Sequence, residues 1–493
     1  MKILLATSEV VPLAKTGGLA DVCGALPVAL QQEGHQPTVI MPAYRQALES
    51  GLPIEQLDLR FDVPIGGKTV SGEVYRTELA DGIPVILVGQ SSYFDRNQLY
   101  REDGEDYPDN CERFVFFSRA VMELIRLLEL KPDIVHCNDW QTGLIPAYLK
   151  LEYANTSGYE NIASLMTVHN LAYQGVFWHW DMALTGLDWS HFNYHEMEFY
   201  GQLNLLKTGL VFADWLTTVS PRYAQEIQTP EHGCGLEGVL QERANVLTGI
   251  VNGVDYKKWS PEHDPHLAQS YDVHNWVDSK PVNKLALQRE LQLPECARTP
   301  LIGVIGRLAS QKGWDLLAPV MRHWAHREDV QWAILGTGEP EYHSLVSDLA
   351  GSHPERVAVR LEFSERMAHR IEAGADMFVM PSRYEPCGLN QLYSLRYGTV
   401  PIVHATGGLA DTICDATPAT FRYGVANGFS FAPYEEPRLD QALRRASTMY
   451  HQPQMGWNKL VENGMKQDWS WRQSARQYIE LYETIRRTKG DAC

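Results

Sequence analysis

With 493 residues the chain is longer than one hydrophobic core usually organises, so we expect two domains of roughly 200 to 250 residues each. Its 44% hydrophobic and 21% charged residues are typical of a globular protein, and its net charge of -18 argues against nucleic acid or an anionic membrane as the bulk partner. The eight cysteines are scattered, without CxxC or metal-ligand spacing, which argues against a disulfide framework and against structural zinc.

The sequence has no stretch typical of a targeting signal or a membrane span. The apolar run before Thr7 and Ser8 is too short for the apolar core of a signal peptide. No later window approaches the ~18 uninterrupted apolar residues that a membrane-spanning helix needs. Together with the dispersed cysteines, these features predict a cytoplasmic protein.

Short apolar runs with strand character alternate along the chain with segments of helical period. These runs occupy residues 2–6, 37–41, 133–137, 165–169, 301–306, 332–336, 377–381 and 400–404. Such alternation predicts α/β domains with parallel sheets that helices cover on both faces. The residues that follow each strand are the candidates for ligand binding, because open α/β sheets bind ligands beyond the carboxyl ends of their strands.

The strand pattern pauses between about 251 and 299, so we place a domain boundary there. This predicts two doubly wound domains, residues 1–250 and 251–465, that face each other across a cleft. The last segment, 466–493, contains a stripe of apolar and aromatic residues at helical spacing. That helix must pack on one of the domains, and its pattern alone leaves either possible.

A glycine-rich loop follows the first apolar run and has a second copy far along the chain. KTGGLADV occupies residues 15–22, and TGGLAD recurs at 406–411. Adjacent glycines let the backbone approach a ligand, while the next helix directs its free N–H groups at an anion such as a phosphate. Lys15 adds a cation, whereas Asp21 lies in the first helical turn, where the helix dipole alone favours a carboxylate. A tight strand-to-helix turn is the structural alternative.

Two further loops combine charged residues with strand exits. Arg307 and Lys312 follow the strand at 301–306 and can stabilise negative charge on a departing diphosphate, although they could also be solvated basic residues. In the loop after 377–381, Glu385 can accept hydrogen bonds from sugar hydroxyls. Three residues there would direct N–H groups at a substrate from a helix start: Cys387, Gly388 and Leu389. For Cys387 we favour packing or substrate contact over nucleophilic catalysis, which needs a neighbouring base.

His169 and Asp139 follow neighbouring strands of the first domain and are candidate ligands of sugar hydroxyls. A structural histidine and a helix-capping aspartate are the alternatives. The GxGxxG at 233–238 does not follow a strand, so we reject a nicotinamide site there. Asp-x-Asp and GxxxxGK[ST] do not occur, which weakens metal-bridged diphosphate binding and excludes a P-loop NTPase.

Taken together, these stretches resemble the bacterial and plant-type glycogen and starch synthases over essentially the whole chain. The resemblance rests on KTGGLADV, HCNDW, TVHNLAYQG, GCGLEG, VNGVD, GRLASQKG, SRYEPCGL and TGGLADT. It implies two Rossmann-like domains in the GT-B arrangement, with the last helix crossing back to the N-terminal domain. It also implies glucosyl transfer from ADP-glucose to the non-reducing 4-hydroxyl of an α-1,4-glucan such as glycogen or a maltooligosaccharide, with retention and without metal or other cofactor.

The resemblance also gives the candidate residues their expected places. The expected catalytic residues are Arg307, Lys312, Glu385, His169 and Asp139. The expected substrate-binding residues are Lys15, Gly17, Gly18, Asp21, Asn170, Asn252, Phe363, Cys387, Gly388, Leu389, Thr406, Gly407 and Gly408.

Within these sets, the resemblance implies that Arg307 and Lys312 clamp the diphosphate. His169 would hold the transferred glucose, Asp139 would lie on the acceptor side, and Phe363 would stack on adenine. Many related transferases carry a second glutamate eight residues after the first, and this chain has Tyr393 there. A UDP-sugar-dependent transferase similar to sucrose synthase and a non-catalytic glucan-binding protein are the alternative functions.

Overall fold

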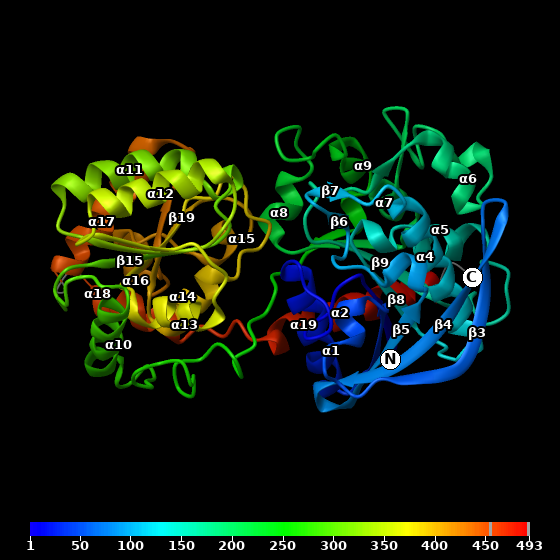
Figure 1. Ribbon diagram of the computed structural model, residues 1–493, viewed down its shortest axis with the longest axis horizontal. Helices are drawn as coiled ribbons and strands as arrows, with labels where there is room; N and C mark the ends of the chain where they lie inside the picture. The colour runs from blue at the N-terminus through cyan, green and yellow to red at the C-terminus, as the bar shows by residue number, and fades with distance from the viewer. Residues whose placement is uncertain (453–455, 491–493) are drawn as a thin grey trace. The chain divides into compact units, whose positions relative to one another are not determined.

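The computed structural model describes residues 1–452 and 456–490 (Figure 1). The chain divides into two compact units. The first unit combines Met1–Gly253 with the segment from Trp471 onward, and the second comprises Val254–Ser470. Among the described residues, no helix combines the length and the apolar character needed to cross a bilayer.

The first unit contains a large mixed sheet in the order β14-β13-β9-β8-β1-β2-β5-β4-β3. Its strands are β1 Lys2–Ala6, β2 Gln36–Pro42, β3 Glu55–Ile65, β4 Lys68–Leu79, β5 Ile83–Gly89, β8 Ile134–Asn138, β9 Ala163–Val168, β13 Trp215–Thr218 and β14 Leu247–Gly249. Neighbours from β14 to β5 are parallel, whereas β5, β4 and β3 pair antiparallel. The strands predicted in this unit are therefore parallel, and the antiparallel strands β3 and β4 were not predicted.

Helices and short strands surround this sheet (Figure 1). The helices are α1 Gly18–Gln32, α2 Arg45–Leu48, α3 Ser91–Phe94, α4 Asn110–Leu127, α5 Leu144–Leu151, α6 Met182–Thr185, α7 Leu205–Phe212, α8 Pro221–Glu226, α9 Glu237–Glu242 and α19 Trp471–Gly490. The short strands are β6 Arg101–Glu102, β7 Glu105–Asp106, β10 Val176–Phe177, β11 Glu198–Phe199 and β12 Gln202–Asn204.

The second unit contains a sheet in the order β17-β16-β15-β18-β19-β20, whose neighbouring strands are parallel. Its strands are β15 Leu301–Ile305, β16 Gln331–Leu335, β17 Val357–Arg360, β18 Met377–Met380, β19 Val400–His404 and β20 Phe429–Phe431. Its helices are α10 Trp276–Glu290, α11 Trp314–Arg327, α12 Pro340–Ser352, α13 Glu365–Gly374, α14 Asn390–Tyr397, α15 Gly407–Thr412, α16 Pro418–Tyr423, α17 Glu436–His451 and α18 Trp457–Met465. All eight apolar runs predicted as strands form strands.

The C-terminal helix α19 packs in the first unit, which resolves the choice that its pattern left open. Its stripe, which includes Ala475, Tyr478 and Tyr482, is buried, and the Tyr482 hydroxyl lies 2.8 Å from His136 Nδ1 on β8. Burying an apolar stripe against a sheet is the main stabilisation of such a helix.

The compact units begin and end a few residues after the predicted boundaries. Residues 251–253 lie with the first unit, because the Ser474 hydroxyl of α19 donates to the Val251 carbonyl (2.7 Å). Gly253 also passes so close to α19 that a Cβ on it would lie 2.4 Å from Trp471 Cα. Residues 466–470 lie with the second unit.

Candidate active site

The glycine loop that follows β1 is held by the carboxylate of Glu9. Glu9 Oε2 accepts hydrogen bonds from the backbone N–H of Thr16 (2.5 Å) and of Gly17 (3.2 Å). Glu9 Oε1 accepts from the Thr16 hydroxyl (2.5 Å) and from the Tyr100 hydroxyl (2.8 Å). The N–H of Gly17 therefore points to the protein, and the groups left for an anion are those in the first turn of α1, from Gly18 onward.

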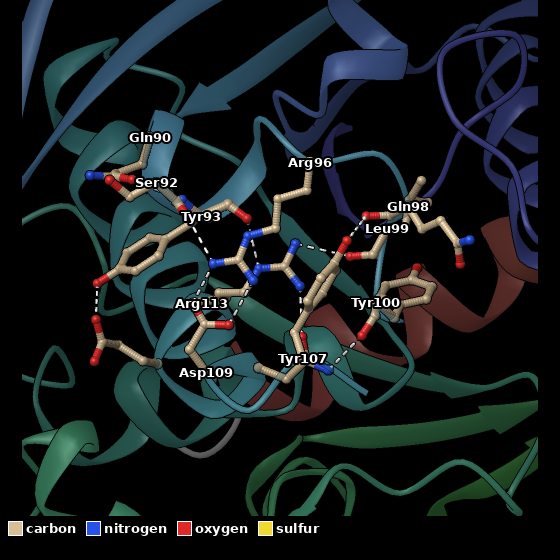
Figure 2. A network of polar contacts seen from close by, with 12 residues as sticks. Gln90, Ser92, Tyr93, Arg96, Gln98, Leu99, Tyr100, Tyr107, Asp109 and Arg113 are labelled. Carbon is tan, nitrogen blue, oxygen red and sulfur yellow. Dashed lines mark hydrogen bonds and ion pairs between the residues drawn. The ribbon is translucent and has the colours of Figure 1, made fainter. Parts of the chain in front are cut away.

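The segment that carries Tyr100 is fixed by the buried guanidinium of Arg113 (Figure 2). Arg113 Nε donates to the Tyr93 carbonyl (2.8 Å), Nη2 donates to the Leu99 carbonyl (2.9 Å), and Nη1 donates to Asn110 Oδ1 (2.6 Å). Hydrogen bonds from a charged donor are stronger than those between neutral groups. Arg113 therefore holds in place the backbone that delivers the Tyr100 hydroxyl to the loop.

Lys15 and Asp21 form an ion pair at the surface of the same loop. Lys15 Nζ lies 2.7 Å from Asp21 Oδ1, and the two side chains are 43% and 34% exposed. Ion pairs with this exposure contribute about 0.2–1 kcal/mol, so Lys15 can leave its partner for an anionic ligand at small cost. Asp21 thus orients Lys15 in the unbound protein.

The two TGGLAD loops use their glycines for different purposes. In the loop at 15–22, a Cβ built on either glycine would meet no atom within 4 Å among the described residues, apart from its chain neighbours and its own helix. In the second loop, a Cβ on Gly407 would lie 2.0 Å from the Glu385 carbonyl oxygen, and one on Gly408 would lie 2.0 Å from the Cys387 carbonyl oxygen. The second pair of glycines therefore allows close packing of two loops, whereas the first pair borders open space that a ligand can fill.

A cationic cluster lies at the carboxyl ends of β15 and β18 in the second unit. Lys312 Nζ lies 2.6 Å from Glu385 Oε2, and the Ser382 hydroxyl donates to the same oxygen (2.9 Å). Glu385 is buried, while Lys312 is about three-quarters buried and Arg307 is exposed, with its Nη2 3.3 Å from Gln311 Oε1. The cluster presents two cations to an anion and keeps a carboxylate beside them.

Asp139 and His169 are joined at the carboxyl ends of β8 and β9. Asp139 Oδ1 accepts the backbone N–H of His169 (2.8 Å), so the aspartate does not act as the helix cap that we considered as an alternative. His169 Nε2 lies 2.9 Å from Asn138 Oδ1, and Asn138 Nδ2 donates to the Ala6 carbonyl (3.1 Å). Asn138 Oδ1 is therefore an acceptor, so Nε2 of His169 carries the proton and Nδ1 is left as an acceptor.

Burial changes the charge of both groups. Burial lowers the pKa of His169 to about 3, so this imidazole is neutral at physiological pH. Burial, together with the negative charge of Glu9, raises the pKa of Asp139 to about 7, although backbone N–H groups oppose this shift. Asp139 also has φ 56°, a backbone conformation that is sparsely populated outside glycine and is frequent at functional sites.

Of three other predicted residues, one has an unsatisfied polar group, one has an exposed ring, and one stabilises a turn. Asn252 is buried in the first unit, and its Oδ1 has no hydrogen-bond partner within the described part of the chain. Phe363 lies between β17 and α13 and is 85% exposed, which leaves the ring free for stacking. Asn170 Oδ1 accepts the Ala172 N–H (3.1 Å), so the Asn170 carbonyl group stabilises the turn after β9.

The remaining predicted residues line the loops before α14 and α15. Cys387 is buried, and Gly388 has φ +69°. Leu389 is the N-cap residue of α14, and Thr406 is the N-cap residue of α15. The N–H groups of Cys387 and Gly388 thus belong to the turn before the helix rather than to its first turn.

Family models match most of the chain. Residues 2–242 match the starch synthase catalytic domain, and residues 292–464 match glycosyl transferases group 1. A glycogen synthase from Rhodopirellula baltica is 48% identical over 98% of this chain and 97% of its own length. The chain belongs to the glycogen and starch synthase family. A glycogen synthase from Syntrophotalea carbinolica is 46% identical over 98% of both chains.

Solved structures agree with this family. The catalytic domain of starch synthase IV from Arabidopsis thaliana, bound to ADP and acarbose, is similar with a TM-score of 0.88 and 34% identity, over 98% of this chain and 99% of that chain. Sucrose-phosphate synthase from Thermosynechococcus elongatus has a TM-score of 0.60 at 17% identity, over 98% of both chains, which shows a shared fold. The chain is a glycosyltransferase with the GT-B fold.

The structure gathers most of the predicted residues of this glycosyltransferase into one cluster on each unit. The cluster of the first unit follows the neighbouring strands β1, β8 and β9 and contains Lys15, Gly17, Gly18, Asp21, Asp139, His169 and Asn170. The cluster of the second unit follows the neighbouring strands β15, β18 and β19 and contains Arg307, Lys312, Glu385, Cys387, Gly388, Leu389, Thr406, Gly407 and Gly408. Sequence patterns missed Glu9 and Tyr100, which position the glycine loop. The one signal for Glu9 is its place in the polar segment that follows the end of β1 at Ala6. Among residues 1–452 and 456–490, no three His, Cys, Asp or Glu side chains gather closely enough to hold a metal ion.

Proposed function

We propose that the chain transfers glucose from ADP-glucose to the non-reducing 4-hydroxyl of an α-1,4-glucan, with retention and without a metal. The observation that carries this proposal is the cluster of Arg307, Lys312 and Glu385 at the carboxyl edge of a parallel sheet. A protein that only binds glucan has no use for cations placed in this way. The starch synthase IV catalytic domain binds ADP and acarbose, which supports an adenine nucleotide as the leaving group.

The proposed reaction proceeds on one face of the transferred glucose. The bond from C1 to the diphosphate oxygen breaks while C1 bonds to the 4-oxygen of the acceptor, and the 4-hydroxyl proton passes to the departing phosphate oxygen. No carboxylate nucleophile is then required. Arg307 and Lys312 stabilise the charge that grows on the diphosphate, which accelerates the reaction because this interaction is stronger in the transition state than in the ground state.

The groups of the first unit bind the glucose and the acceptor in this proposal. Lys15 and the first turn of α1 bind negative charge and donor hydroxyls. The unprotonated Nδ1 of the neutral His169 accepts a hydrogen bond from a glucose hydroxyl, and Asn252 Oδ1, which has no partner among the described residues, accepts another. Asp139 lies on the acceptor side. In the second unit, Phe363 offers an exposed ring to the base.

The donor and the linkage are tested together by incubating the protein with glycogen and radiolabelled ADP-glucose or UDP-glucose, followed by α-amylase digestion. We expect label to enter glycogen from ADP-glucose and to be released by the amylase. The Phe363 ring has no hydroxyl and can stack on either base, so it does not by itself select the nucleotide. Label that enters glycogen only from UDP-glucose would show that the chain is the UDP-sugar-dependent transferase of the alternative function. No incorporation from either donor would refute the proposed transfer.

A further inference from the structure

A row of aromatic side chains comes from the segments before and after helix α6 in the first unit, a helix that Figure 1 labels. Trp178, Trp180 and Trp189 are 62%, 57% and 43% exposed. Their ring centroids are 6.3 Å apart from Trp178 to Trp180 and 5.6 Å apart from Trp180 to Trp189, and Phe192 continues at 5.6 Å from Trp189. Each of these pairs is arranged edge to face. We call these four residues the aromatic row.

The aromatic row stands on a well-held backbone. Phe177, directly before Trp178, packs against Trp140 with centroids 5.6 Å apart and pairs in the sheet of β10 and β12. Asp188 Oδ1 accepts the N–H of Ser190 (2.8 Å) and so fixes the turn that carries the third tryptophan. The indoles are therefore exposed although their backbone is held in place. An exposed apolar patch of this kind marks an interaction site.

The chemistry of the row fits a chain of glucosyl units. Each glucosyl ring has apolar C–H faces that can stack on an indole, and a rim of hydroxyls that needs hydrogen-bond partners. Indole rings supply the apolar face and an N–H donor together, and the exposed Asp188 beside the row supplies carboxylate oxygens. A neutral polysaccharide also avoids the repulsion that a net charge of -18 imposes on a second copy of the chain or on an anionic partner.

The row is also continuous with the site that the proposed function assigns to the acceptor. Trp140 directly follows Asp139, packs against Phe177, and Phe177 directly precedes Trp178. The backbone at Gly175 packs so closely on Trp140 that a Cβ added to Gly175 would lie 2.3 Å from the indole. Packed rings thus lead from the acceptor side of the cluster to the exposed tryptophans.

We propose that the aromatic row binds an α-1,4-glucan chain at the surface of the first unit. The inference rests on the proposed function, because its ligand is the polymeric acceptor of that reaction. A polymer held at a second point on the protein presents its ends at a raised effective concentration. The row therefore increases the apparent affinity for glycogen, whereas a short oligosaccharide that cannot span both places gains nothing.

The test compares glycogen with maltotriose as acceptor for the double variant Trp178→Ala/Trp180→Ala. We expect the glycogen KM to rise about tenfold, while kcat/KM for maltotriose changes less than about twofold. Native gels that contain glycogen measure the same binding without catalysis, because binding to glycogen retards the protein in the gel. Trp178→Phe/Trp180→Phe keeps planar rings and should retain most of the retardation. Tyr423→Ala, which removes a 79% exposed aromatic from the second unit, is the matched control.

Unchanged glycogen retardation and KM in the double alanine variant would overturn the inference. The main alternative is that the row is an interface between two copies of the chain, and light scattering tests it. Loss of a dimer in the double alanine variant, with unchanged glycogen binding, would show such an interface. The inference and the proposed function also fail separately. A wild-type protein that transfers no glucose refutes the function, while the gel assay still reports whether the row binds glycogen.

Discussion

Replacing the corresponding glycine in each TGGLAD loop by alanine should show which glycine leaves room for a ligand and which one allows two loops to pack closely. Gly18 and Gly408 occupy the same place in the two copies, and each lies in the first turn of a helix. Alanine is favoured over glycine in helices by up to about 1 kcal/mol. In the part of the chain that the structure describes, a Cβ on Gly18 meets no atom within 4 Å beyond its own helix and chain neighbours, so we expect Gly18→Ala to be as stable as the wild type or slightly more stable.

Gly408→Ala should instead destabilise the second unit. Its Cβ would lie 2.0 Å from the Cys387 carbonyl oxygen, which belongs to the backbone and cannot rotate away. Overpacking costs about 1–3 kcal/mol, and such a contact belongs at the upper end of that range. After subtracting the gain in helix propensity, the expected loss is about 2 kcal/mol. In a unit of this size that loss lowers Tm by about 4–8 °C.

The assays are thermal unfolding and initial rates. Two units need not unfold in one transition, so hydrogen exchange in α1 and in α15 should accompany the melting curve. Gly18→Ala places a methyl group where the proposal places the donor, and a displaced donor costs turnover on the order of 100-fold. Full activity in Gly18→Ala would show that the donor does not use the open space. A wild-type melting curve for Gly408→Ala would refute the packing argument.

Four further predictions concern charged groups. Arg307→Ala should lower kcat about 100- to 1,000-fold with less than about 0.5 kcal/mol change in stability, because the side chain is exposed. Lys312→Ala should lower kcat similarly but also lower Tm, because it leaves the buried Glu385 unpaired, and equal Tm values for these two variants would contradict the ion pair. The raised pKa of Asp139, about 7, predicts an inflection near that pH in kcat/KM that Asp139→Asn removes. The folded protein binds the Asp139 proton more tightly than the unfolded chain does, so this carboxyl lowers the free energy of unfolding as the pH rises from about 4 to about 7. Melting curves recorded across this pH range should show that Asp139→Asn lacks this pH dependence. Glu9→Gln replaces one hydrogen-bond-accepting oxygen by an N–H group, which cannot accept from the glycine loop. We therefore expect the KM for the sugar donor to rise about tenfold in steady-state kinetics while the fold is unchanged. A wild-type KM would show that the glycine loop does not need this carboxylate.

The strands that could be predicted from sequence are those buried on both faces. Residues 301–306 and 377–381 are apolar throughout because helices cover both sides of a parallel sheet. The long hairpin of β3 and β4 escaped prediction because β3 is largely exposed at its start and alternates buried with exposed residues near its end. Its charged residues hide the period-2 signal that an edge strand with one solvated face gives.

Candidate residues could be found where a local motif carries them, but their partners could not. Lys312 is paired with Glu385 across 73 positions, and Tyr100 reaches Glu9 across 91 positions. No local periodicity contains such a contact, since only the fold brings the ends of different strands together. The two TGGLAD loops are a further example. Their sequences are identical, but only the second loop packs against the Cys387 carbonyl, so the glycines of the two loops have different roles.

The two ion pairs of the clusters differ in how readily they can release their cations. The Lys15–Asp21 pair is well exposed, and pairs of that kind hold together by about 0.2–1 kcal/mol. The Lys312–Glu385 pair is largely buried, and breaking a buried pair costs about 3–5 kcal/mol. We therefore expect an anionic ligand to draw Lys15 away from Asp21 easily, whereas Lys312 would have to meet a diphosphate while it still contacts Glu385. In the proposed function, Glu385 thus fixes the position of the cation that stabilises the leaving group, whereas Lys15 is a cation that can move.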